Sequence, residues 1–167
     1  RDHMPGQHRD FFAALPFLVL AAGDAEGRPW VSLLEGSEGF IATPEARRLI
    51  LHARLAAQDP LAGALRAGAE IGLLGIDLAS RRRNRVNGVV HSTRDGYGIH
   101  VRQSFGNCPQ YIQLRDFAVA GDPTAPWKVE GFSGDHLDKT AVETAVSLMA
   151  SAVGVDVPVV EFGTYEP

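Results

Sequence analysis

The chain has 167 residues, of which 45% are hydrophobic and 22% are charged, and its formal net charge is −4. This length accommodates one sizeable hydrophobic core, and the negative charge argues against a nucleic-acid partner, which would require a basic surface. A single cysteine cannot form an internal disulfide. The longest apolar run, residues 11–22, is interrupted by Pro16 and is too short to cross a bilayer. These features predict a cytoplasmic protein that does not enter a membrane.

The first half of the chain has the pattern of short strands joined by turns. Residues 7–14 are expected to form a short helix that Pro16 ends, and residues 17–22 and 28–34 are expected to pair as a hairpin. Further extended pieces are expected at residues 40–42 and 49–53. Residues 59–68 begin with Asp-Pro and end with Gly, a combination that predicts another short helix.

The second half continues this pattern and then changes character. Strands are predicted at residues 71–76, 85–91 and 98–102, the last two joined by a turn at Asp95 and Gly96. Residues 137–153 are rich in alanine with apolar residues at helical spacing, and residues 157–162 could form a terminal strand. The expected organisation is a mainly β core with flanking helices over residues 1–115, with a C-terminal loop, helix and strand over residues 116–167 packed on the same domain.

The stretch SFGNCPQYIQLR at residues 104–115 combines the only cysteine with several side-chain amides. Gly106 and Asn107 are residue types that readily adopt left-handed backbone angles, so a sharp turn is expected there. Asn107 could also cap a short helix through residue 115, which would place Cys108 near a helix N-terminus and beside a ligand. The alternative is a plain turn with a half-buried cysteine, and residue spacing favours that alternative.

The sequence RRRNR at residues 81–85 is the one dense positive cluster. Such a cluster is usually a solvated edge strand that resists aggregation. If the strand is half-buried instead, alternation sends Arg83, Arg85 and Asn87 to one face, where the guanidinium groups could clamp a phosphate. Arg54, just past another predicted strand, could add a third cation.

Signatures of several common reactions are missing from the sequence. The six histidines show no paired spacing with each other, with the cysteine or with carboxylates that would predict a metal site. No GxSxG elbow, P-loop or GxGxxG motif occurs. Serine hydrolysis and the usual modes of nucleotide binding therefore have little support.

The segments RRRNRVNG (residues 81–88) and SFGNCPQYIQ (residues 104–113) together resemble the pyridoxamine-phosphate-oxidase-like group of flavin-binding split barrels. The resemblance covers residues 4–115 and is closest to a subgroup in which the module stands alone or is joined to a flavin and iron–sulfur reductase. It implies a six-stranded antiparallel split β-barrel. It also implies a homodimer with FMN in a groove at the interface, with a reductase or a ferredoxin-type protein as a possible electron donor.

The resemblance also implies which residues of this chain meet the cofactor. The strand after the first hairpin would lie along FMN with Trp30, Val31, Ser32 and Leu33, and the end of the next long strand would approach the ribityl phosphate with His52, Ala53 and Arg54. The arginine-rich strand would reach the cofactor with Arg83, Arg85 and Asn87. The amide-rich stretch would lie beside the isoalloxazine with Asn107, Cys108, Gln110 and Tyr111.

Two departures from the family pattern bear on function. The oxidases proper carry Arg and Lys at the two ends of the cofactor strand, where this chain has Trp30 and Glu35. Vitamin phosphate oxidation is therefore not expected, and the leading hypothesis is an FMN-dependent oxidoreductase of unknown substrate with no assigned catalytic residue. The alternatives are a non-catalytic flavin carrier, sensor or assembly module, and a barrel that has exchanged FMN for a deazaflavin or for haem, with His52 or His91 as haem ligand.

Overall fold

The computed structural model describes residues 1–92, 94, 96–108, 110, 112–116, 118 and 121–122. The chain divides into two units, Arg1–Trp127 and Lys128–Pro167, and all described residues belong to the first. The helix predicted over residues 137–153 and the strand predicted over residues 157–162 lie outside the described residues. So does most of the segment expected to pack on the core.

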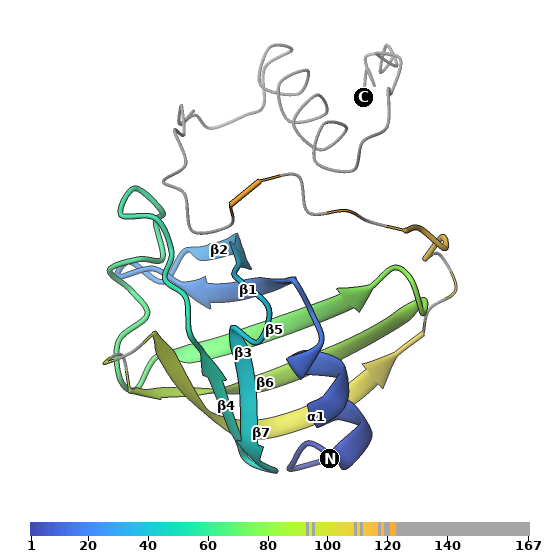
Figure 1. Ribbon diagram of the computed structural model, residues 1–167. Helices are drawn as coiled ribbons and strands as arrows, with labels where there is room; N and C mark the ends of the chain where they lie inside the picture. Colours follow the sequence, from blue (N-terminus) through green and yellow to red (C-terminus); the bar gives the residue numbers. More distant parts are fainter. Residues whose placement is uncertain are drawn as a thin grey trace, which may run out of the picture. The chain divides into compact units, whose positions relative to one another are not determined.

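The described unit is built on a single antiparallel sheet (Figure 1). Its seven strands, in the spatial order β2-β1-β5-β6-β7-β4-β3, are β1 (Phe17–Gly23), β2 (Pro29–Glu35), β3 (Ile41–Glu45), β4 (Arg48–Leu51), β5 (Glu70–Asp77), β6 (Arg82–Ser92) and β7 (Tyr97–Asn107). No pairing among the described residues joins β2 to β3, so the sheet is not closed. The predicted mainly β, antiparallel architecture is confirmed. The sheet has seven strands where six were expected, because the short piece after Phe40 pairs with β4 and forms an edge strand of its own.

The hydrophobic core lies on the inner face of the sheet, beneath the one described helix. Helix α1 (Gly6–Ala13) is displaced by one residue from the predicted helix at residues 7–14, and it buries Phe11 and Phe12. These rings and Leu15 pack directly over Gly75 of β5, where a Cβ atom would lie only 2.5 Å from Leu15 Cδ1. The small residue in β5 therefore lets the helix approach the sheet closely.

Residues 59–68 do not form the predicted helix but a series of hydrogen-bonded turns. Asp59 caps the segment as expected, because its Oδ1 accepts hydrogen bonds from the Leu61 amide (2.8 Å) and the Ser32 hydroxyl (2.9 Å). Gly68 has a φ of +93°, and Leu61 and Leu65 are buried in the core. The cap at Asp59 is therefore present, but the glycines at 63 and 68 disfavour a continuous helix after it.

Gly106 and Asn107 do not make the predicted sharp turn. Both belong to β7, where they pair with Asn84 and Arg83 of β6. Neither is among the described residues with a left-handed φ, and no helix follows over residues 112–116. Cys108 is exposed just after β7 and is not at a helix N-terminus. The start of β6 offers a pairing partner to this segment, so ladder hydrogen bonds outweigh its local turn preference.

Candidate functional site

The two segments that carry the sequence resemblance are neighbours in the sheet. The arginine-rich segment forms the start of β6, and residues 103–107 form the end of β7. Across the hairpin, Arg85 pairs with Phe105. The residues on either side pair in the same register, with Arg83 opposite Asn107 and Asn87 opposite Gln103. The fold therefore joins two stretches that are about twenty residues apart in sequence into one surface.

Strand β6 divides its side chains between the two faces of the sheet. Asn84 and Val86 point into the core, whereas Arg83, Arg85 and Asn87 are on the opposite side, which we call the outer face. This is the arrangement that alternation predicted. The arginine-rich cluster is thus not a uniformly solvated edge, because β6 is an interior strand paired on both sides.

An apolar strip crosses the outer face from β2 toward β6. The register of the strands places side chains opposite one another in rows, so residues far apart in sequence share the strip. Val31 is 69% exposed and Leu33 is 56% exposed. One row runs through Leu33, Val19, Leu74, Arg85 and Phe105, and the next runs through Val31, Ala21, Gly72, Asn87 and Gln103.

The β6–β7 end of the outer face is polar. The Arg85 guanidinium lies 5.6 Å from the centre of the Phe105 ring, and Asn87 Nδ2 donates a hydrogen bond to Gln103 Oε1 (3.0 Å). Beside them, Arg83 Nε and Asn107 Oδ1 are buried without a hydrogen-bond partner. An unpaired buried donor or acceptor is unfavourable, so this end of the face suits a polar group supplied from outside the chain.

The predicted cofactor strand contributes only part of its residues to the outer face. Val31 and Leu33 lie on it, but Ser32 is buried on the other side, where its hydroxyl donates to Asp59 Oδ1. The indole of Trp30 donates to Asp24 Oδ2 (2.8 Å) in the β1–β2 turn. The side chain that stands where the oxidases have Arg is therefore held in a structural contact.

The predicted residues that follow β4 lie far along the hairpin from the arginine cluster. Arg54 Nη2 donates to the Arg94 carbonyl (2.9 Å), in the connection between β6 and β7. Arg83 lies at the other end of β6, nine positions before Ser92, which is roughly 30 Å along an extended strand. Within one chain, the structure does not bring Arg54 to the same phosphate as Arg83 and Arg85. Ala53 packs against the core, and His52 is exposed beside it.

The remaining predicted residues do not belong to the two outer-face rows. Cys108 and Gln110 are exposed beyond the end of β7, and Tyr111 lies outside the described residues. His91, considered as a haem ligand, is exposed on β6.

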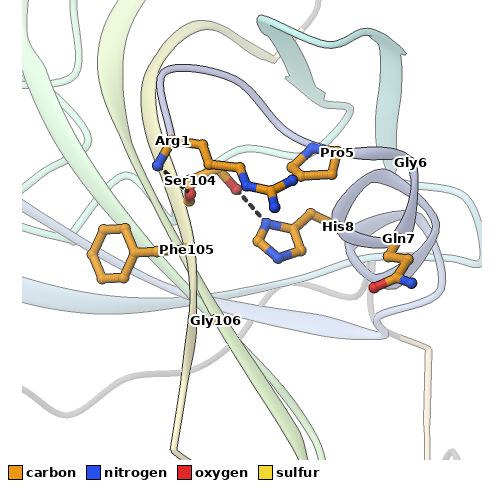
Figure 2. Close-up of a pocket in the computed structure, with 8 residues that line it drawn as sticks. All are labelled: Arg1, Pro5, Gly6, Gln7, His8, Ser104, Phe105 and Gly106. Carbon is orange, nitrogen blue, oxygen red and sulfur yellow. Dashed lines mark hydrogen bonds between the residues drawn. The ribbon is translucent and has the colours of Figure 1, made fainter.

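A cavity of about 650 Å³ lies between β7 and the start of α1 (Figure 2). Sequence reasoning did not identify it. His8 Nδ1 and Ser104 Oγ share a hydrogen bond of 2.7 Å across it, although the two residues are 96 positions apart. Only the three-dimensional fold reveals this contact, because neither residue belongs to a motif with recognisable spacing.

Among the described residues, no three His, Cys, Asp or Glu side chains come together in a way that could hold a metal ion. Within the same part of the chain, no helix has the length and apolar character required to span a membrane.

Comparisons with known proteins place the chain in a family. No curated protein matches it significantly. Solved structures that resemble it include HupZ of Group A Streptococcus, with 14% identity and a TM-score of 0.47 over 68% of this chain and 99% of that one. An F420 reductase is 15% identical with a TM-score of 0.42 over 63% of this chain and 97% of that one. Residues 4–120 match the family described as pyridoxamine 5'-phosphate oxidase, and the chain therefore belongs to that family.

Proposed function

We propose that this protein binds FMN on the outer face of its sheet and acts as a flavin-dependent oxidoreductase. Family membership supports a flavin. The observation that carries the proposal is that Arg83 Nε and Asn107 Oδ1, on cross-strand neighbours, are both buried without a hydrogen-bond partner. They lie next to Arg85 and to the exposed apolar strip. A ligand with an apolar ring system, polar ring edges and a phosphate has matching partners on this face.

Different parts of the outer face suit different parts of FMN. The exposed side chains of Val31 and Leu33, continued across the sheet by Val19 and Leu74, suit a flat aromatic ring. The amides of Asn87 and Gln103 suit the polar edge of that ring, since each carries both donor and acceptor atoms. Because Trp30 and Glu35 replace the usual Arg and Lys, binding of the phosphate depends on Arg83 and Arg85.

The protein's own contribution to chemistry is binding, orientation and exclusion of water. When bound, a flavin supplies the redox chemistry, accepting electrons from one substrate and passing them to another. The two outer-face rows defined above contain arginine, amide, aromatic and aliphatic side chains. Arginine remains charged across the physiological pH range, so in these rows it stabilises negative charge and does not exchange protons.

We further propose that a second copy of the chain covers the outer face, with the cofactor between the two copies. The strip through Val31 and Leu33 is contiguous and exposed, as expected for a surface that another molecule buries. A reductase or ferredoxin-type protein as electron donor remains a prediction from the family resemblance.

The cofactor proposal is tested by titrating the purified protein with FMN and following flavin absorbance and fluorescence. Replacing both Arg83 and Arg85 by Ala should weaken FMN binding by at least about tenfold, because charge-assisted hydrogen bonds to phosphate are lost. Arg66→Ala is the matched control, since Arg66 is an exposed arginine in the 59–68 turns and belongs to neither outer-face row. Equal affinities for the double variant and the control would contradict the proposal, as would the absence of saturable flavin binding.

The second candidate function is a non-catalytic flavin carrier, sensor or assembly module. It is favoured by the loss of the Arg and Lys pair and by the structural use of Trp30. Steady oxidation of a reduced nicotinamide with oxygen or a dye as acceptor supports the enzyme, whereas flavin binding without turnover supports the carrier. Parallel titrations with haemin and a deazaflavin test whether another cofactor takes the place of FMN.

A further inference from the structure

The sheet has two edge strands, β3 and β2, and they differ in how well they are protected against pairing with another strand. Strand β3 is five residues long and contains Pro44, and its register with β4 shifts between Ala42 and Glu45. A short, irregular strand with a proline and an exposed charge is a poor partner for a further strand. Strand β3 therefore has the features by which natural proteins prevent edge pairing.

Strand β2, at the other edge, lacks this protection (Figure 1). It has seven residues, all paired with β1 in one unbroken register. Its one proline, Pro29, is its first residue, its one charged residue, Glu35, is its last, and Val31 and Leu33 between them are exposed. Among the described residues, no backbone hydrogen bond beyond the pairing with β1 involves this strand. A regular, apolar and exposed edge of this kind is a site for strand addition.

The β1–β2 turn shows which backbone groups of β2 point to the open edge. The Asp24 amide donates to the Arg28 carbonyl oxygen (3.0 Å), so these two residues are a hydrogen-bonded pair of the antiparallel ladder. Hydrogen-bonded pairs alternate along such a ladder, and the register therefore assigns the bonds to β1 to the even-numbered residues of β2. The N–H and C=O groups of Val31 and Leu33 point the other way, toward the open edge.

The sequence of β2 is complementary to itself in the antiparallel direction. With Ser32, the midpoint of the strand, on a two-fold axis, Val31 of each copy lies opposite Leu33 of the other. Both residues direct their backbone groups to the edge, so each of these pairs exchanges both of its N–H···O=C hydrogen bonds. The same register places Glu35 opposite Pro29 at either end. The two carboxylates are thereby kept apart, whereas parallel pairing would set like charges side by side.

We propose that two copies of this chain join by antiparallel pairing of their β2 strands, which makes one continuous sheet. This inference rests on the dimer of the proposed function and specifies where the second copy attaches. Pairing lengthens the apolar strip, because the row that starts at Leu33 continues with Val31 of the second copy, and the row that starts at Val31 continues with its Leu33. Each copy thus contributes side chains to the surface on which the other binds its cofactor.

The test is hydrogen–deuterium exchange of the purified full chain, read residue by residue by mass spectrometry at two protein concentrations. The amides of Val31 and Leu33 should exchange at least about tenfold more slowly in the dimer than in the diluted monomer. The amides of Trp30 and Ser32, which bond to β1, should be protected at both concentrations and serve as internal controls. A dimer without protection at Val31 and Leu33 would overturn edge pairing but not the dimer or flavin binding. A chain that stays monomeric, or protection that persists in the monomer, would also overturn it.

Two substitutions at one position separate the backbone contact from the side-chain contact. Val31→Pro removes an edge-directed N–H that the β1 ladder does not use, so the fold should persist, with slow exchange at Ser32 as its check. Dimerisation should weaken by at least about tenfold, because the two-fold axis removes two hydrogen bonds from each dimer. Val31→Ile keeps the amide and an apolar side chain and should dimerise like the wild type. Equal dimer affinities of the two variants in analytical ultracentrifugation would overturn the proposal.

Discussion

At the scale of single residues, Asp24 holds the Trp30 side chain at the start of β2. Its side chain is 7% exposed and accepts hydrogen bonds from the Trp30 indole (2.8 Å) and from the Arg28 amide (2.8 Å) and Nε (2.6 Å). Burial raises the pKa of Asp24, but these bonds and the Arg28 charge outweigh burial and lower the pKa to about 2. Trp30 therefore takes part in organising the β1–β2 turn.

Asp24→Asn should lower the free energy of unfolding at neutral pH, because the ionised carboxylate is the form that the turn binds. A group whose pKa falls on folding contributes stability above its unfolded pKa, and that contribution is lost as the pH falls toward its folded pKa. The difference between wild type and variant should therefore shrink from pH 3.8 toward pH 2. Urea unfolding at several pH values measures it, with Glu38→Gln as an exposed control. An equal difference at all pH values would contradict this assignment.

At the scale of elements, the β6–β7 hairpin carries most of the candidate site, and a register shift after Asn87 determines its geometry. Gly88 lies at this shift, where an added Cβ atom would sit 2.4 Å from the His100 carbonyl oxygen and 2.8 Å from Ile99 Cγ2. The backbone of β7 cannot move away without breaking ladder hydrogen bonds. Glycine at this position thus lets the hairpin keep both its bulge and the pairing of Asn87 with Gln103.

Gly88→Ala should destabilise the protein by about 1–3 kcal/mol through overpacking against β7, and it should also weaken FMN binding by disturbing the neighbouring amides. Gly63→Ala is the control, because no atom lies within 4 Å of the corresponding Cβ position. Chemical denaturation gives the stability and flavin titration gives the affinity. A variant as stable as the control would show that the hairpin absorbs the side chain without strain.

At the scale of the whole molecule, the outer face should behave as an interface between two copies. Leu33→Glu places a charge in the exposed β2 part of the apolar strip, where burial of an unpaired carboxylate against a second copy is strongly unfavourable. The variant should shift from dimer to monomer in light scattering coupled to size-exclusion chromatography, whereas Ala46→Glu, in the β3–β4 turn, should not. A monomeric wild type, or a dimer in both variants, would contradict the proposed interface.

Features that depend on neighbours in sequence were predictable. Alternation placed Arg83, Arg85 and Asn87 on one face, and Gly96, which has a φ of +111°, marked the turn between β6 and β7. Alternating side chains and left-handed turn residues act through the local backbone, so their signal is present before any tertiary contact forms. The resemblance to the family indicated in addition which strands are expected to meet a cofactor.

Only the tertiary structure decided the features that depend on residues far apart in the sequence. Residues 104–107 became a strand because β6 was there to pair with them, and the capped segment after Asp59 formed turns whose two leucines are buried in the core. The fold also tied Trp30 to a turn, separated Arg54 from Arg83, and joined His8 to Ser104 beside the cavity between α1 and β7. Pairing and burial over long sequence separations outweigh local preference, and sequence spacing does not encode them.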